Sequence, residues 1–162
     1  MKYIFYALSF IIVILFEMTI SDLLSIRGIS PHFSIVVLAY VGLVEGRARS
    51  TTIGFVFGLF QDLAGSGLIG LNALTKSVIG FFFGQFVGLS RTHRILVPGL
   101  IIFMADLIHN FLVALFVPNI PFGTVLIKAV LAGIYTSLVG MIIFAFLTES
   151  AWRRIEMVEE PF

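Results

Sequence analysis

Six apolar runs divide the chain, and short turns with polar residues or glycine separate them. The runs cover Tyr3–Ile20, Phe33–Val44, Thr51–Ala64, Leu71–Leu89, Ile95–Val117 and Thr124–Thr148. Four of them approach the ~20 residues that a helix needs to cross ~30 Å of hydrocarbon, whereas the second and third are short. Open strand edges do not persist in lipid, so the runs are expected to be helical. The pattern predicts an all-α integral membrane protein, a compact bundle of six transmembrane helices.

Composition supports this class. Hydrophobic residues make up 59% of the 162 residues and charged residues 12%, about half the charged share of an ordinary soluble domain. The net charge of +1 leaves no basic footprint for nucleic acid, and the absence of cysteine excludes disulfides and thiolate-bound zinc. We expect a single domain over residues 1–148, followed by a short cytoplasmic tail at 149–162. No small-residue cleavage site follows the first run, so we expect it to remain as a helix.

The distribution of basic residues predicts the orientation. If the N-terminus is cytoplasmic, alternation of six helices places seven of the ten Lys and Arg side chains inside and leaves Arg27, Lys76 and Lys128 outside or near the outer ends of helices. The inner set is Lys2, Arg47, Arg49, Arg91, Arg94, Arg153 and Arg154. Both termini are therefore predicted in the cytoplasm. The two short runs could each span a thinned bilayer, lie buried in the bundle, or form one re-entrant hairpin, which would leave this orientation unchanged.

Small residues recur at spacings of four along three of the runs, which places each set on one helix face. The sets are Gly54 and Gly58; Gly80, Gly84 and Gly88; and Ala129, Gly133 and Ser137. Small residues let helix backbones approach closely in a membrane. Either these faces pack within the bundle or one of them docks a partner's transmembrane helix.

Five charged residues lie within the apolar runs, where each would cost about 2.5–3.5 kcal/mol at a helix centre. They are Glu17, Asp62, Lys76, Asp106 and Lys128, with His109 and Asn110 one turn from Asp106. In the predicted topology they gather toward the outer half of the bundle. We predict a polar network there, with Asp62–Lys76 and Asp106–Lys128 as candidate pairs. The alternative is that Glu17 and the two lysines only extend to the interface.

No catalytic or metal site is predicted. His32, His93 and His109 fall in an outer loop, an inner loop and the bundle, so the three are not expected to share a metal. Asp106 and His109 have the spacing of a proton relay, although a satisfied buried histidine is the simpler interpretation. No nucleophile triad or phosphate-binding loop is present. We expect neither an enzyme nor a cofactor.

The segment from Gly54 to Leu74 resembles the rod shape-determining protein MreD family. In that family a glycine-rich helix leads to Gly-Leu-x-x-Asp and then, through a glycine-punctuated loop, to Gly-x-x-Ala-Leu. The matching positions are Gly58, Leu59, Asp62, Gly65, Gly70, Ala73 and Leu74. Ser30-Pro31-His32 stands where family members often have Pro-Asp. The expected local structure is a hairpin with positive φ at its glycines, and with Asn72 capping the helix that follows.

The resemblance implies a non-catalytic scaffold of the bacterial elongation machinery in the cytoplasmic (inner) membrane. Such a protein binds MreC and links MreB filaments to the peptidoglycan synthases RodA and penicillin-binding protein 2, and so controls cell shape. The layout is also similar to the substrate-binding subunits of energy-coupling-factor vitamin transporters. A small-ligand-binding subunit with an outer pocket is therefore the alternative, and a proton-coupled permease using Asp106 and His109 is a third possibility. Besides these proteins, only membrane lipids are expected partners.

Overall fold

The computed structural model describes residues 12, 17, 19, 23–65, 68–86, 95–116 and 121–146. Most of the first apolar run lies outside the described residues, as do the Arg91–Arg94 turn and the predicted tail at 149–162. The first transmembrane helix and the tail therefore stay predictions. Glu17 is the one buried residue of that first run whose surroundings are described.

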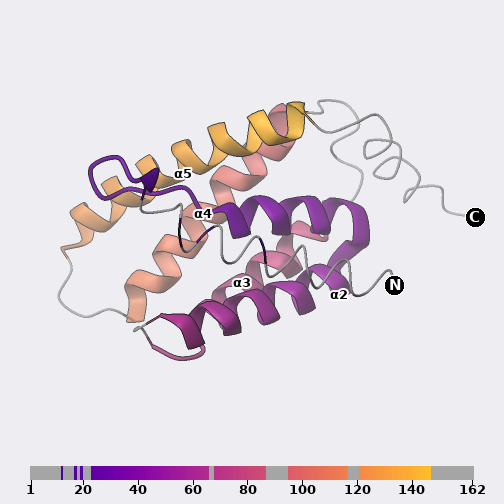
Figure 1. Cartoon of the computed structure of the whole chain (residues 1–162), viewed down its shortest axis with the longest axis horizontal. Helices are drawn as coiled ribbons and strands as arrows, with labels where there is room; N and C mark the ends of the chain where they lie inside the picture. The colour runs from indigo at the N-terminus through magenta and orange to yellow at the C-terminus, as the bar shows by residue number, and fades with distance from the viewer. Residues whose placement is uncertain are drawn as a thin grey trace, which may run out of the picture.

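Four helices make up most of the described part (Figure 1), and they confirm the predicted all-α class. They are α2 (Phe33–Ala64), α3 (Leu71–Phe83), α4 (Leu96–Phe116) and α5 (Phe122–Ala145). Within the described ranges there is no strand, only an isolated bridge between Ile26 and Ile29 around a tight turn. By length and composition α4 and α5 could each cross a membrane, and α3 is a shorter apolar helix. Six crossings stay a prediction.

α2 is a helical hairpin rather than a straight helix. Gly46 has φ 78° and ψ −175°, and the chain doubles back there, at the right of Figure 1. The two arms, 33–45 and 47–64, correspond to the second and third apolar runs, and are about 20 and 27 Å long at 1.5 Å per residue. The turn between the two arms is thus a single glycine, because only glycine adopts this backbone conformation readily.

The second arm of α2 packs against α3 with their glycines facing one another. A Cβ on Gly54 would meet the carbonyl group of Lys76, and one on Gly58 would meet that of Asn72. From the other side, a Cβ on Gly80 would meet the carbonyl group of Ser50. Each of these approaches is closer than the 3.0 Å that real Cβ atoms keep from other atoms. The two predicted glycine faces are therefore the two sides of one contact, which we call the glycine seam.

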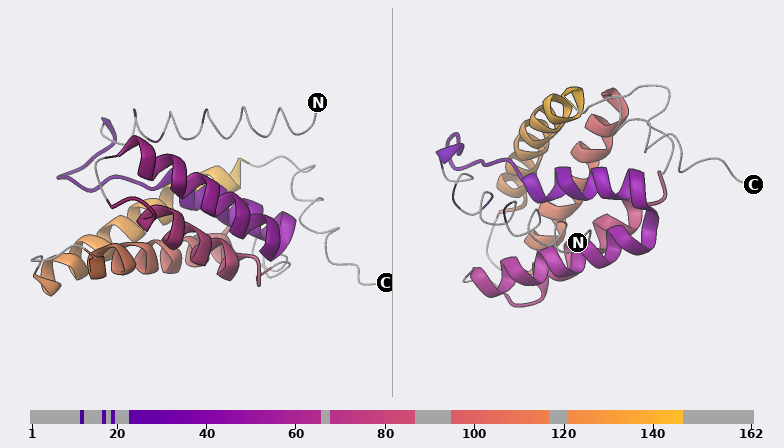
Figure 2. Two further views of the ribbon diagram at one scale, coloured as in Figure 1. Left: turned by 90° about the horizontal axis from the view of Figure 1, so that it is seen from below. Right: turned by 45° about the vertical axis from the view of Figure 1, so that its right-hand side comes forward.

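α4 and α5 form a second helix pair, which lies beside the α2–α3 pair in both views of Figure 2. An apolar core joins the two pairs. Its members come from the first arm of α2 and from α3, α4 and α5, and its most buried large side chains are Ile35, Leu38, Leu43, Ile79, Phe83, Ile102 and Phe144. Tyr40 packs edge-on against Phe144, with ring centroids 6.4 Å apart.

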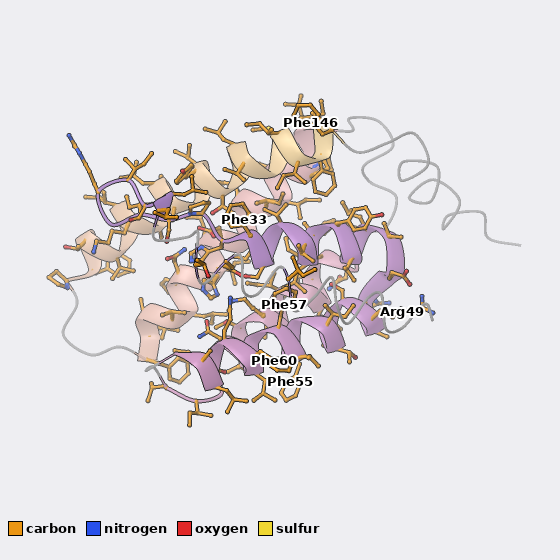
Figure 3. All side chains as sticks on the ribbon, in the orientation of Figure 1. Phe33, Arg49, Phe55, Phe57, Phe60 and Phe146 are labelled. Atoms are coloured by element: carbon orange, nitrogen blue, oxygen red, sulfur yellow. The ribbon has the colours of Figure 1, made fainter. Side chains whose placement is uncertain are left out.

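The outer surface of the bundle is apolar. On the second arm of α2, Phe57 is fully buried, whereas Phe55 and Phe60 are about half exposed and point away from the bundle in Figure 3. Leu100 on α4 and Ile127 on α5 are 60% and 63% exposed. Large apolar side chains that cover long helices on all sides are typical of a protein whose solvent is lipid.

Candidate functional site

A group of polar side chains lies inside the bundle, near the end where the first arm of α2 begins and its second arm ends. We call it the polar cluster. Its members are Glu17, His32, Asp62, Lys76, Asp106, His109 and Thr136, and all but His32 are less than a tenth exposed. Figure 3 shows nitrogen and oxygen atoms gathered between the ribbons in this region. Charges at such depth persist only with compensating partners.

Asp62 caps α3 from outside that helix. Its carboxylate accepts hydrogen bonds from the backbone N–H groups of Gly70, Asn72 and Ala73, at 2.9, 3.0 and 3.0 Å. The first-turn N–H groups of a helix lack intrahelical partners and carry the positive end of its dipole, so they suit a carboxylate. Asp62 thus bonds backbone donors where a direct ion pair with Lys76 was predicted.

The expected role of Asn72 as a side-chain cap is also corrected. The residue at the start of α3 is Gly70, and no side-chain cap bond forms there. Gly70 has φ 96°, which confirms the predicted positive φ at this position, but Gly65 has φ −91°. The left-handed turn at Gly70 lets the chain present its N–H groups to Asp62.

Glu17 ties the first apolar run to both arms of α2. Its carboxylate accepts bonds from the N–H and hydroxyl groups of Ser34, at 3.2 and 2.9 Å, and from Nε2 of Gln61 at 2.9 Å. Because Glu17 is only 5% exposed, it does not extend to an interface. Ser34 and Gln61 sit at opposite ends of the hairpin sequence, so one carboxylate holds both arms.

Asp106 on α4 is the centre of a second set of bonds. Its carboxylate lies 2.6 Å from Nδ1 of His32, and it accepts from Thr136 Oγ1 at 3.2 Å and Asn110 Nδ2 at 3.0 Å. Thr136 also accepts the backbone N–H of His32 at 3.2 Å. The predicted Asp106–Lys128 pair is wrong, because Lys128 is exposed on α5. Asp106 instead joins α4 to α5 and to the start of α2.

Lys76 lies at the middle of the cluster and is 1% exposed. The carboxylates of Glu17, Asp62 and Asp106 all act on its charge. Their opposite sign compensates an ammonium group that would otherwise be very unfavourable in an apolar interior. Lys76 therefore belongs to the polar cluster and does not reach a membrane interface.

His32 and His109 are neighbours. Their ring centroids are 5.0 Å apart at an interplanar angle of 67°, which corrects the expectation that these histidines are far apart. The reason is that His32 directly precedes α2, whose first turn packs beside α4. Nδ1 of His109 is buried and has no hydrogen-bond partner among the described residues. His93, the third histidine, lies outside them. The described residues contain no group of three or more acidic or histidine side chains arranged as a metal site.

Comparison with known families decides what kind of protein carries this cluster. The family model for the rod shape-determining protein MreD matches residues 1–149. The chain belongs to the MreD family. No curated protein and no solved structure matches it. It is therefore a cell-shape protein, and its two long apolar helices accord with a place in the membrane.

The family motif of this MreD chain is one three-dimensional unit. Gly58 lies against the carbonyl group of Asn72, and Asp62 binds the N–H groups of Gly70 and Ala73, so the two halves of the motif contact each other. Leu59 is half-buried beside them, and Leu74 is 52% exposed. The motif residues thus build the α2–α3 connection.

The remaining predicted packing positions occupy two places in this chain. Gly84 lies against the backbone of Arg47 at the tip of the hairpin, while Gly88 lies outside the described residues. On α5, Ala129 is buried, a Cβ on Gly133 would meet the ring of Phe103, and Ser137 Oγ donates to the carbonyl of Gly99 at 2.8 Å. This α5 face therefore contacts α4.

Sequence reasoning missed two members of the polar cluster, His32 and Thr136. His32 was assigned to an outer loop, and Thr136 was not singled out; a hydroxyl on an apolar helix usually bonds its own backbone. One signal was available: Thr136 follows Ala129 and Gly133 on nearly the same helix face, at spacings of seven and three.

Proposed function

We propose that this MreD chain is a non-catalytic scaffold of the bacterial elongation complex. It binds MreC in the cytoplasmic membrane and, through MreC, links MreB filaments to RodA and penicillin-binding protein 2, thereby controlling peptidoglycan synthesis and cell shape. The family match over residues 1–149 supports this role.

The observation that carries the scaffold assignment is how the carboxylates of the polar cluster are used. Glu17, Asp62 and Asp106 each accept three hydrogen bonds, and all the donors except Asn110, which shares α4 with Asp106, come from other elements. A carboxylate surrounded in this way holds helices in place and has little remaining capacity for proton transfer or nucleophilic attack. The buried polar groups thus serve architecture.

The proposed topology has six crossings, with both termini in the cytoplasm and the two arms of α2 counted separately. The tip of the hairpin supports this orientation, because Arg47 and Arg49 are exposed there. Arg49 pairs with Glu45, and the guanidinium of Arg47 lies 5.9 Å from the centroid of the Phe81 ring. Arginines at a helix turn favour the cytoplasmic face. The polar cluster then lies toward the outside.

The test is affinity purification of the tagged full chain from detergent-solubilised membranes, followed by mass spectrometry. We expect MreC among the recovered proteins, and rounding of rod-shaped cells when the chain is depleted. Gly54→Leu should abolish both the recovery of MreC and the rescue of cell shape, because it forces the second arm of α2 away from α3. Gly123→Leu is the matched control, since nothing lies within 4 Å of a Cβ at that position.

Three outcomes would contradict the proposal. One is wild-type purification without MreC, and another is normal shape in depleted cells. The third is recovery of an energising ATPase in place of MreC, which would favour the small-ligand-binding subunit of a transporter.

A further inference from the structure

The scaffold role uses the contact between His32 and Asp106, but it leaves Nδ1 of the neighbouring His109 unexplained. Nδ1 of His109 has no hydrogen-bond partner among the described residues, and the residue is only 6% exposed. A buried nitrogen without a partner is destabilising. An occupant that bonds this nitrogen would remove that penalty.

His32 is oriented by a carboxylate. Because Asp106 engages Nδ1 at 2.6 Å, the ring of His32 has its second nitrogen, Nε2, free of that contact. A carboxylate on one imidazole nitrogen is the usual support of a histidine that binds metal through the other. The side chain of His32 is 26% exposed, so the site can be reached from the end of the bundle.

The spacing of the rings suits one shared ion. Two imidazoles on a tetrahedral Zn²⁺, with Zn–N near 2.0 Å, have ring centroids roughly 5 Å apart. The observed centroids of His32 and His109 are 5.0 Å apart.

Across the polar cluster as a whole acidic groups outnumber basic ones, although the charge of Lys76 also acts on His109. Glu17, Asp62 and Asp106 outnumber Lys76, the one buried lysine among the described residues. If all four are ionised and both histidines are neutral, two negative charges remain, which a divalent ion would neutralise. The three carboxylates already accept three hydrogen bonds each, so the atoms left to coordinate a metal are imidazole nitrogens. Nitrogen ligands select Zn²⁺-like ions over Mg²⁺ or Ca²⁺.

We propose that His32 and His109 bind one divalent transition-metal ion of the Zn²⁺ class, with Asp106 positioning His32. Two protein ligands leave the other coordination positions to water, so the ion is exchangeable. The site lies at the end of the bundle where α2 begins, and a bound ion would tie the start of α2 to α4.

The experiment uses the full chain, purified with a histidine-free tag and stripped with a chelator. Co²⁺ serves as the spectroscopic probe for tetrahedral coordination, and Zn²⁺ affinity comes from competition with a chromophoric chelator. We expect one ion per chain, no competition by Mg²⁺, and at least tenfold weaker Zn²⁺ binding in both His32→Ala and His109→Ala. Asp106→Asn should weaken binding roughly 10–100-fold while keeping the stoichiometry.

His93→Ala is the matched control and should bind like wild type. His109→Gln keeps a polar side chain of similar size and should fold like wild type by circular dichroism, yet bind as poorly as His109→Ala. The proposal is overturned if wild type binds no ion, if the two histidine variants bind like wild type, or if His93→Ala is equally impaired. The proposal would also be overturned if the histidines took up a proton and Co²⁺ gave no spectrum of tetrahedral coordination. MreC recovery is measured separately, so the scaffold role and the metal site can fail independently.

Discussion

Replacement of Gly54 by alanine tests whether the glycine seam sets the distance between α2 and α3. A Cβ at Gly54 would lie 2.8 Å from the carbonyl carbon of Lys76 and closer still to its oxygen, whereas ordinary contact begins at 3.4 Å. The atoms it meets are backbone, so no side chain can rotate away. The two helices must therefore separate locally by at least about 0.6 Å.

The expected magnitude combines two opposing effects. Overpacking of a close contact destabilises by about 1–3 kcal/mol. Alanine in place of glycine within a helix stabilises by about 1 kcal/mol, because less backbone entropy is lost on folding. The net expectation for Gly54→Ala is a loss of up to about 2 kcal/mol in the free energy of unfolding. The displacement also moves the backbone that carries Lys76 in the polar cluster.

The assay is reversible unfolding of the purified chain in mixed micelles with increasing sodium dodecyl sulfate, followed by far-ultraviolet circular dichroism. Gly123→Ala is the matched control, because its Cβ meets nothing within 4 Å on α5. It should be neutral or stabilised by up to about 1 kcal/mol. If Gly54→Ala proves as stable as Gly123→Ala, the helices are not in the close contact described here.

Three further predictions concern the polar cluster and the orientation. In the same unfolding assay Asp62→Ala should lower the free energy of unfolding by about 2–3 kcal/mol, because three backbone N–H groups at the start of α3 lose their acceptor. Asp62→Asn should lower it less, since one oxygen remains, and equal losses in the two variants would contradict the capping role. Lys128→Ala should change stability by no more than about 0.5 kcal/mol, as expected for an exposed side chain, and a loss above 1 kcal/mol would show a partner for this lysine. With no cysteine in the native chain, Leu23→Cys should react with an impermeant maleimide in intact cells and Ala48→Cys only after the membrane is opened; the reverse pattern would invert the proposed topology.

How much of this fold follows from sequence differs between local and distant contacts. The fifth run matches α4 to within one residue at each end, whereas α3 ends at Phe83, six residues before the predicted end of the fourth run at Leu89. The second and third runs form the two arms of a helical hairpin, but its single-residue turn at Gly46 was not predicted. A spacing pattern identifies which face of a helix carries small residues, but it does not show which other helix packs against that face. The pairing of Gly54 with α3 therefore needed the structure.

For the polar cluster, too, the local properties of residues could be predicted from sequence, whereas their distant contacts could not. The burial cost of a charge in an apolar run is a local property, so Glu17, Asp62, Lys76 and Asp106 could be selected from sequence. Their partners could not, because they depend on contacts such as His32 with Asp106, which are 74 residues apart. The error at Lys128 has the same origin: lysine near a helix end can remain exposed by extending toward the interface.

The polar cluster explains how two helix pairs with smooth apolar surfaces acquire a single arrangement. Apolar helices in lipid gain little from one register over another, because lipid tails contact them as well as a neighbouring helix does. Asp106 removes that freedom. Its bonds to His32 and Thr136 form only when the start of α2, the middle of α4 and the middle of α5 are level with one another. A shift of one helical turn, about 5.4 Å, would leave a carboxylate buried without its donors. The same residues that make the interior unusually polar therefore hold the bundle in one shape, which the proposed scaffold role requires.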